Sequence, residues 1–335
     1  MDFKKEIKKL YNIEIANITS LSGGWVNEKY LITCLHGEKY VLKELSMNKF
    51  PKNHFNVVCE TVNLQKRMYD NGLLVPNVIS NMELELITIF SNSKYYFLQE
   101  YIFGKKCEFN EFNLSEIKSI ALNLAILHKY LLGIPIEKFQ SSFLEYKNIN
   151  ILKKEFNDRL NEINEDTNIE YKREISRQDK IIKNIENSQI LLKQELQLIH
   201  GDFTPDNIII NNNNVSAFID FELCRVNTRL QDVGRIILSL CLTTNGLSKE
   251  KLNSFLQGYS SICEITVQDI VDAIKFVWIN EVNLWIREKY FRNYNPPKVN
   301  KFIYEIQWIS MNWFDLENII KDVLNYEKCK SKLWN

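Results

Sequence analysis

The chain has 335 residues, of which 45% are hydrophobic and 25% are charged, and its 42 basic and 42 acidic side chains cancel to a formal net charge of zero. This length provides for about two domains or lobes with a substantial core, while the balanced charge and the lack of a basic cluster give no reason to expect a nucleic-acid partner. No window approaches the ~20 apolar residues of a membrane span, so we expect no membrane partner and predict a cytoplasmic protein.

The first hundred residues have the pattern of a small antiparallel sheet with one helix. Residues 18–45 are rich in aromatic and β-branched side chains around an "HGE" turn, as in antiparallel hairpins. Residues 56–72 carry apolar side chains on one side and end at a glycine, which predicts a helix. Two more strands are predicted at 84–90 and 94–102, around the turn "SNSK". We predict an N-terminal lobe over residues 1–103, with a hinge near 99–103.

The remaining residues, 104–335, read mainly as helices. Residues 113–132 repeat leucine and isoleucine at spacings of three and four, which predicts an amphipathic helix. Residues 153–197 combine mixed charge with helical periodicity and contain no proline or glycine, so we interpret them as an insertion of exposed helices. An asparagine cluster at 211–214 is interpreted as the tip of a hairpin. The predicted fold class is therefore α+β, with a small sheet lobe and a larger helical lobe.

Three polar residues flank two short apolar runs in the middle of the second lobe. Asp202 and Asn207 precede the run "III", and Asp220 follows the run "VSAFI". If the two runs pair as a hairpin, the three polar residues meet at one end of it. A carboxylate and an amide oxygen suit a hard ion such as Mg²⁺, which shares its other positions with water and phosphate oxygens. The remaining carboxylate, on Asp202, is suited to accept a proton from an attacking hydroxyl.

These residues also carry a family resemblance. The pattern HGDxxxxN at 200–207, followed by "DF" at Asp220, resembles the protein-kinase-like phosphotransferases, and Gly201 is similar to the aminoglycoside phosphotransferase and choline kinase branch. The resemblance implies a two-lobed kinase-like fold in which Asp202 is the catalytic base and Asn207 and Asp220 bind Mg²⁺. It also implies that ATP donates its γ-phosphate to a hydroxyl of a small molecule.

A phosphotransferase needs groups that hold the nucleotide, and the N-terminal lobe offers two charged candidates. Lys43 ends a predicted strand, a position from which an ammonium reaches the α and β phosphates. Glu60 lies on the following predicted helix, where an ion pair with Lys43 would hold that ammonium in place. Each charge alone is more typical of a solvated surface. Their order along the chain, before the hinge and the catalytic motif, favours the nucleotide site.

Two backbone segments complete the predicted nucleotide site. The turn at Ser22, Gly23 and Gly24 has glycines that let backbone N–H groups approach phosphates, although it lacks the full GxGxxG pattern and a plain hairpin turn is an equal alternative. The second segment falls at the predicted hinge, where the backbone is expected to contact the adenine edge. Its residues are Glu100, Tyr101 and Ile102.

Two further residues match the family as supports of the catalytic motif. His128 lies in "LAILH", which resembles a helix of the family, and we interpret it as a buried core histidine with satisfied hydrogen bonds. Asp232 occupies the position at which the family has an acid that binds the backbone of the catalytic loop. We therefore assign Asp232 to the scaffold.

The acceptor stays open at the level of sequence. The last third of the chain is rich in aromatic residues, with Trp278 and Trp285 two helical turns apart and Glu281 and Glu288 at the same interval. These residues either form a cleft for a sugar or an ammonium or fill the core between helices, and we favour the core. An aminoglycoside, an amino alcohol, homoserine and a sugar all remain candidate acceptors.

A second class of function is a kinase-fold structural or binding protein, such as a spore-coat-associated protein with weak or no catalysis. Loss of catalysis is expected to remove the lysine, the base or a metal ligand first. All of these groups are present, which favours an active enzyme. The five residues are Lys43, Glu60, Asp202, Asn207 and Asp220.

Overall fold

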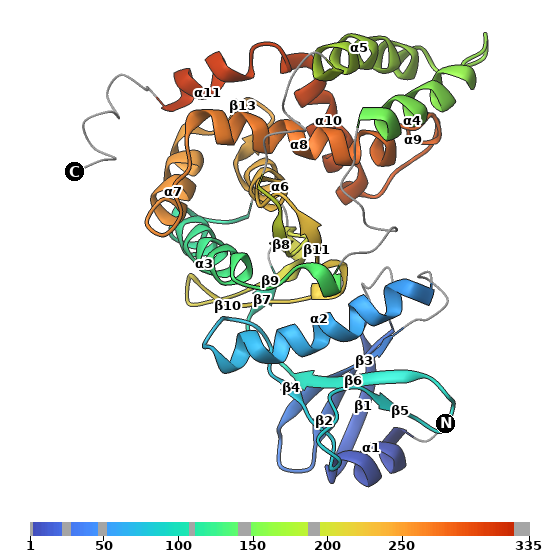
Figure 1. Ribbon diagram of the computed structural model, residues 1–335, viewed down its shortest axis with the longest axis vertical. Helices are drawn as coiled ribbons and strands as arrows, with labels where there is room; N and C mark the ends of the chain where they lie inside the picture. Colours follow the sequence, from blue (N-terminus) through green and yellow to red (C-terminus); the bar gives the residue numbers. More distant parts are fainter. Residues whose placement is uncertain are drawn as a thin grey trace. The chain divides into compact units, whose positions relative to one another are not determined.

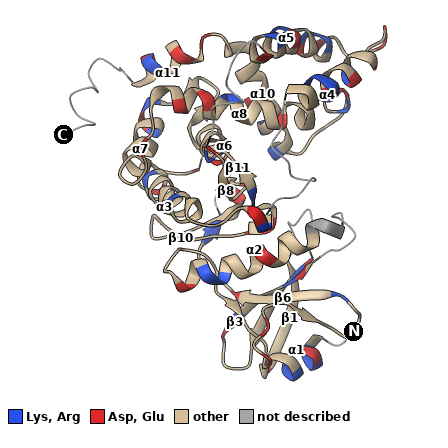
Figure 2. Ribbon diagram, in the orientation of Figure 1, with Lys and Arg blue, Asp and Glu red and all other residues tan. Residues whose placement is uncertain are grey.

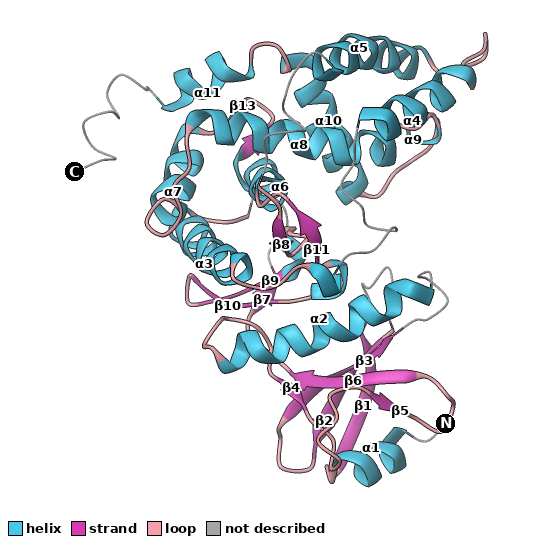
Figure 3. Cartoon of the chain, viewed as in Figure 1, coloured by secondary structure: helices cyan, strands magenta, loops and turns pink. Residues whose placement is uncertain are grey.

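The computed structural model describes residues 3–21, 28–45, 52–106, 111–139, 149–186 and 195–324. Contacts between residues divide the chain into two compact units. Unit 1 joins residues 1–106, 135–144 and 206–225, and unit 2 joins residues 107–134, 145–205 and 226–335. Figure 3 shows that most strands belong to unit 1 and most helices to unit 2. This is an α+β fold with an antiparallel sheet and a mainly helical second part, as predicted. The lobe boundary at residue 103 stays a prediction.

Unit 1 is built on a six-stranded antiparallel sheet (Figure 1). Along the sheet the order is β1 (Ile15–Leu21), β2 (Lys29–Cys34), β3 (Lys39–Leu45), β6 (Tyr95–Glu100) and β4 (Val78–Ile79), and β5 (Thr88–Ile89) also pairs with β6. The "HGE" turn joins β2 to β3, with Gly37 at a φ of 94°. This confirms the hairpins predicted for residues 18–45.

The strand predicted at 84–90 is much shorter in the structure. Residues 81–85 form a turn in which the Asn81 side chain accepts hydrogen bonds from the N–H groups of Glu83 and Glu85. Leu84 adopts a φ of 66°, which a strand does not allow. Local side-chain bonding therefore overrides the apolar alternation, and pairing is left only at Thr88–Ile89.

Two helices cover opposite faces of the sheet in unit 1. On one face, α1 (Phe3–Tyr11) packs Ile7 against Leu42. On the other, α2 (Lys52–Asp70) packs Val58 against Leu45. Successive side chains of β3 point to opposite faces, so the strand contributes to both clusters. The helix predicted at 56–72 is thus confirmed, beginning four residues earlier, and Gly72 follows its end at a φ of 79°.

A second, three-stranded sheet completes unit 1, with β9 (Ile208–Asn211) between β10 (Asn214–Phe218) and β7 (Lys105–Lys106). The turn of the β9–β10 hairpin has Asn212 at a φ of 48° and Asn213 at 62°, the left-handed pair typical of a tight hairpin. This confirms the asparagine cluster as a hairpin tip. A Cβ atom on Gly104 would lie 2.6 Å from the Ile210 carbonyl oxygen, so only glycine fits beside this hairpin.

Unit 2 is a bundle of helices with short strands between them. Its first long helix, α3 (Leu114–Leu132), begins at a capping box of Asn113 and Glu116 and confirms the helix predicted at 113–132. The other helices are α4 (Ile149–Asn161), α5 (Ile169–Glu186), α6 (Leu230–Cys241), α7 (Lys249–Tyr259), α8 (Val267–Trp285), α9 (Lys289–Arg292), α10 (Pro297–Asn312) and α11 (Leu316–Leu324). The strands that pair within this part are β8 (Gln197–Ile199) with β11 (Arg225–Asn227) and β12 (Leu242–Thr243) with β13 (Gly246–Leu247).

The charged segment predicted at 153–197 forms two helices in contact, α4 and α5, which begin at Ile149 and end, within the described residues, at Glu186. Figure 2 shows acidic and basic residues interspersed along both helices. One cation is not solvated: Arg159 of α4 is buried and donates to the Gln178 side chain and the Ile286 carbonyl. Residue 197 already belongs to β8. The prediction of charged helices is therefore confirmed, and its status as an insertion stays a prediction.

Several tryptophans among the described residues of the last third belong to the core of unit 2. Trp278 is fully buried, donates from Nε1 to Ser310 Oγ at 2.8 Å, and packs against the buried Trp313 ring. Trp285 is partly buried and lies 4.7 Å from the Phe302 ring centroid. These contacts confirm the core interpretation for Trp278. In the part of the chain that the structure describes, no helix combines the length and apolar character that crossing a membrane requires.

Candidate active site

The HGD turn follows β8 in unit 2 and is held by a buried acid. Asp232, in the first turn of α6, accepts hydrogen bonds from the backbone N–H groups of His200 at 2.7 Å and Gly201 at 3.0 Å. Gly201 has a φ of 81°, which favours glycine at this position. Asp202 comes next, partly exposed, and its carbonyl accepts from the Thr204 N–H at 2.9 Å. The predicted contact of Asp232 with the backbone of this turn is confirmed.

Behind Asp232 lies a buried hydrogen-bond chain. His128 Nε2 is 3.4 Å from Asp232 Oδ2, His128 Nδ1 is 2.8 Å from the Tyr259 hydroxyl, and Arg229 donates to that hydroxyl at 2.9 Å. Burial lowers the pKa of His128, so its ring is neutral near pH 7. Burial would raise the pKa of Asp232, but hydrogen bonds from His128 and from the Gly201 N–H lower it. His128 is thus the buried, satisfied histidine that the sequence predicts.

The two predicted metal ligands lie at the base of the β9–β10 hairpin in unit 1. Asn207 ends the short helical turn η3 (Pro205–Asn207), and its carbonyl accepts from the Ile219 N–H at 2.9 Å. This bond brings Asn207 next to the residue that precedes Asp220. Asp220 adopts φ 68° and ψ 58°, a left-handed conformation that costs energy for a residue with a side chain. Such conformations gather at functional sites.

Lys43 is nearly fully buried and has two carboxylate partners. Its Nζ lies 2.6 Å from Asp220 Oδ1 and 2.8 Å from Glu222 Oε1, and 5.5 Å from the centroid of the Phe97 ring. Burial alone would lower the pKa of Lys43, but the two carboxylates raise it well above its ordinary value. For the Asp220 carboxyl, burial alone would raise the pKa, but the charges of Lys43 and Lys29 hold the pKa far below its ordinary value. Both groups are therefore charged.

The predicted ion pair between Lys43 and Glu60 is wrong. Glu60 is partly exposed on α2, and its carboxylate lies 3.7 Å from Lys138 Nζ instead. Glu222 takes its place, because the turn η4 (Phe221–Leu223) that follows Asp220 brings this second carboxylate to the same ammonium. The "DFE" triplet is the sequence signal that identifies Glu222.

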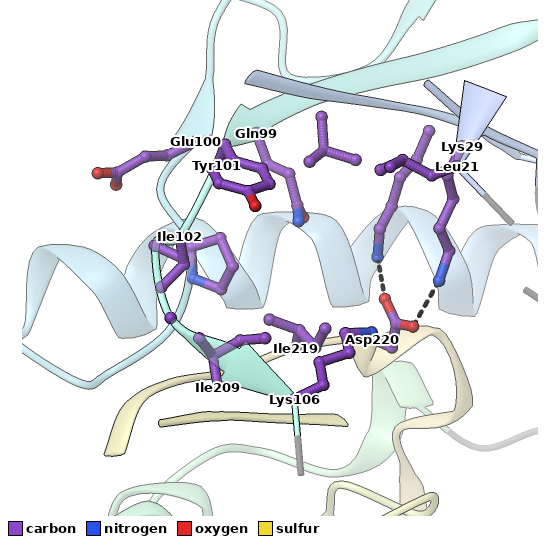
Figure 4. A pocket seen from close by; sticks show the side chains of 14 residues that line it. Leu21, Lys29, Gln99, Glu100, Tyr101, Ile102, Lys106, Ile209, Ile219 and Asp220 are labelled. Atoms are coloured by element: carbon purple, nitrogen blue, oxygen red, sulfur yellow. Dashed lines mark hydrogen bonds and ion pairs between the residues drawn. The ribbon is translucent and has the colours of Figure 1, made fainter. Parts of the chain in front are cut away.

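Unit 1 contains a cavity of about 280 Å³ that is lined by Lys43, Asp220 and residues of the predicted hinge (Figure 4). Three cations, Lys29, Lys43 and Lys106, line the cavity together with Asp220, and Glu100 is a second acidic residue of the lining. Lys29 and Lys106 were not predicted as site residues, because nothing in the sequence distinguishes them from the many lysines of a protein surface. The rest of the cavity is a slot with apolar walls. Its apolar lining consists of Leu21, Val41, Pro76, Ile102, Ile209 and Ile219.

Residues 100–102, for which a hinge is predicted, line another part of this cavity, and their backbone donors differ in their bonding. The Glu100 N–H donates to the Asn77 carbonyl at 2.8 Å, and the Tyr101 N–H donates to the Lys39 carbonyl at 3.2 Å. The Ile102 N–H donates to no residue that the structure describes. All three residues line the cavity. Among these three residues, Ile102 is the one whose backbone N–H has no acceptor within the described residues.

The glycine turn predicted to cover the phosphates lies outside the described residues. Ser22, Gly23 and Gly24 precede β2 in the sequence, and their assignment to the nucleotide site stays a prediction.

A kinase-like fold, a turn of the form HGDxxxxN and a lysine bonded to the following aspartate together define a phosphotransferase of the kinase-like class. Residues 17–264 match the model of the phosphotransferase enzyme family known as APH, which is more than half of the chain. The chain belongs to this family.

Solved structures with the same fold include several small-molecule kinases. A microcompartment-associated aminopropanol kinase superposes with a TM-score of 0.67 and 14% identity, over 93% of this chain and 97% of that one. An amicoumacin kinase in complex with AMP-PNP and Ca²⁺ has a TM-score of 0.65 and 14% identity, over 94% and 95%. The GDP complex of aminoglycoside 2'-phosphotransferase-IIIa has a TM-score of 0.64 and 16% identity, over 92% and 98%. A search of curated proteins returned no match.

Proposed function

We propose that this protein uses ATP and Mg²⁺ to transfer a γ-phosphate to a hydroxyl of a small molecule. The observation that carries the proposal is the cavity of unit 1, which has a largely apolar lining, a backbone donor without an acceptor among the described residues, and a group of lysines with Asp220. The apolar region with its backbone donor suits a purine base, and the group of lysines suits a polyphosphate. The family assignment supports the same chemistry.

The proposed nucleotide site has a role for each part of the cavity. The purine ring lies between the apolar walls, and the Ile102 N–H donates to its edge. Lys43 donates to phosphate oxygens from its buried position on β3, where strand pairing limits its motion. The three lysines that line the cavity offer ammonium donors to the phosphate oxygens of an anionic ligand.

The donor set at the base of the hairpin fits magnesium. Asn207 offers an amide oxygen and Asp220 a charged carboxylate, and a hard cation with oxygen ligands prefers both. These two residues would hold Mg²⁺, which supplies positive charge beside the phosphate groups when it is bound. Asp202, in the turn held by Asp232, accepts the proton of the acceptor hydroxyl. The proposal assigns no other covalent step to the protein.

The acceptor is proposed only as a class. Relatives of the same fold are described as kinases of amicoumacin and aminopropanol and as phosphotransferases of spectinomycin and aminoglycosides. We propose an aminoglycoside, an amino alcohol, homoserine or a sugar as acceptor. The proposed location is the cytoplasm, where ATP is available. The alternative is a spore-coat-associated binding protein without catalysis.

The proposal is tested by binding and by turnover. Calorimetry should detect ATP binding that requires or is strengthened by Mg²⁺, and a panel of hydroxyl-bearing amines, sugars and antibiotics should contain an acceptor that stimulates ADP release. Asp202→Asn should abolish transfer while leaving ATP affinity within about threefold of wild type, because the base contacts the acceptor and not the nucleotide. Asp206→Asn, a neighbouring acid in the same turn, is the matched control and should retain transfer. No ATP binding with Mg²⁺ present would refute the proposal.

A further inference from the structure

Lys29 is the second lysine of the cavity whose ammonium meets Asp220. It begins β2 and pairs directly with Lys43 across the strands, so both side chains leave the same face of the sheet. Lys29 Nζ lies 2.5 Å from Asp220 Oδ2, while Lys43 Nζ lies 2.6 Å from Oδ1 (Figure 4). One carboxylate thus bridges two cations on adjacent strands.

The two lysines differ in what else they contact. Lys43 also has Glu222 as a partner and its side chain is only 2% exposed. Among the carboxylates of the described residues, only Asp220 forms an ion pair with Lys29, whose side chain is 16% exposed at the edge of the cavity. Like charges opposite each other on paired strands are destabilising. An arrangement of two lysines on one acid therefore favours a role in binding anions over a role in stability.

In the proposed function, the ion pair between Lys29 and Asp220 competes with the binding of a metal ion by Asp220. If Asp220 turns a carboxylate oxygen to a metal ion, the contact with Lys29 is lost, and an ammonium that is mostly removed from water needs another anion. The phosphate groups of a bound nucleotide are the anions that the same cavity would contain. Lys106, which also lines the cavity, adds to the positive charge there rather than offsetting it.

We propose that Lys29 is a second phosphate-binding residue of the nucleotide site, which pairs with Asp220 when the site is empty and with a phosphate oxygen when nucleotide is bound. The proposal rests on the proposed function of the cavity. It adds a cation on β2 to the one on β3, so that the phosphates are held from two adjacent strands.

The test compares Lys29→Met with Lys94→Met as a matched control. Lys94 also pairs with a glutamate, with Nζ 2.7 Å from Glu44 Oε1, but Glu44 precedes Leu45 and follows Lys43 on β3, so it points to the other face of the sheet. Binding of ATP, ADP and adenosine is measured by calorimetry in EDTA and with Mg²⁺. With Mg²⁺ present, when the metal ion takes the Asp220 carboxylate, we expect Lys29→Met to weaken ATP binding about tenfold and to leave adenosine binding within twofold, since only the phosphates lose a partner. Lys94→Met should leave both unchanged, and Lys29→Arg should recover most of the ATP affinity.

A second background separates a direct contact with phosphate from an effect through Asp220. In Asp220→Asn, Lys29→Met should still weaken ATP binding in EDTA several-fold. If the effect of Lys29→Met vanishes there, or if ATP and adenosine weaken equally, Lys29 acts only on the shape of the site and the proposal is wrong. Adenosine binding also verifies that the variant is folded, and Lys29→Gln replaces Lys29→Met if it is not. Absence of ATP binding by wild type would overturn the proposed function and this proposal together, whereas normal wild-type binding with no loss in Lys29→Met overturns this proposal alone.

Discussion

At the scale of single residues, the ammonium of Lys43 determines much of the site. It is removed from water, and it is stabilised by carboxylates at 2.6 and 2.8 Å that both come from the segment after the hairpin. Sequence order suggested Glu60 as its partner because the helix follows the strand. The structure instead pairs Glu60 with a lysine of η1 (Glu137–Phe139), at 3.7 Å. Glu222, in the short turn that follows Asp220, reaches Lys43, whereas Glu60 on α2 does not.

This difference leads to a prediction about Glu222 and Glu60. Glu222→Gln leaves a buried ammonium with one charged partner instead of two, so we expect the free energy of unfolding to fall by about 2 kcal/mol. Glu60→Gln removes a long, largely exposed ion pair and should change stability by less than about 0.5 kcal/mol. Urea unfolding of both variants measures the difference. Equal effects, or a larger effect of Glu60→Gln, would contradict the assignment of Glu222.

At the scale of elements, helix packing in unit 2 depends on glycines at close crossings. Gly234 lies inside α6, where an added Cβ would be 2.0 Å from the Ala273 carbonyl oxygen of α8. Gly258 of α7 makes a similar approach, with an added Cβ 2.3 Å from the Lys118 carbonyl oxygen of α3. Intrinsic propensity disfavours glycine in a helix by about 1 kcal/mol, so these glycines remain because of their neighbours.

Gly234→Ala is therefore expected to destabilise the protein although alanine is the better helix former. A backbone oxygen at 2.0 Å cannot move aside as a flexible side chain would, so the helices must separate, at a cost of about 3 kcal/mol. Gly133→Ala is the matched control, because a Cβ there would meet only an ordinary contact of 3.5 Å at the end of α3. Thermal or urea unfolding compares the two. A Gly234→Ala variant as stable as wild type would show that the crossing adjusts freely.

Elements also show where a sequence pattern reaches its limit. The helix at 113–132 and the asparagine hairpin were predictable because periodicity, capping residues and turn residues all act locally. The strand expected at 84–90 was wrong over most of its length. Its alternation was correct as a pattern, but Asn81 bonds the backbone of the next residues and turns the chain before pairing begins.

At the scale of the whole molecule, three helices of unit 2 and the HGD turn meet in one buried hydrogen-bond network. His128 of α3, Tyr259 of α7 and Asp232 of α6 connect these helices to the backbone of the HGD turn. Because burial lowers the pKa of His128, the folded chain keeps this ring neutral at a pH where the unfolded chain begins to protonate it. The network therefore links global stability to pH.

The sign of this linkage gives a prediction. As the pH falls below about 6.5, the unfolded chain binds a proton at this residue and the folded chain does not, so the free energy of unfolding falls, by at most about 1.4 kcal/mol per pH unit from this group. The lowered pKa of Asp232 acts only at a more acidic pH. His128→Gln should flatten the dependence between pH 7.5 and 5.5, whereas replacement of the exposed His36 by glutamine should not. Urea unfolding at the two pH values measures it, and an unchanged slope in His128→Gln would refute the assignment.

The cavity of unit 1 depends on the tertiary structure, because its lining residues come from segments that are distant in sequence. Lys43 and Asp220 are separated by 177 residues and Lys29 and Asp220 by 191. Asp202 belongs to unit 2, only four residues before the segment of unit 1 that begins at Asp206. No linear pattern relates these positions except the order of the motifs.

The sequence by itself determined the class of protein, the HGDxxxxN turn, the following hairpin and the long helices, because each depends on residue types at short, regular spacings. Tertiary structure alone decided which acid neutralises Lys43, that Lys29 shares Asp220, and that the Ile102 N–H meets no acceptor among the described residues. The physical reason is that these contacts depend on strand register and on which face of a sheet a side chain leaves. Neighbouring lysines of opposite strands, such as Lys29 and Lys43, are brought together only when that register forms.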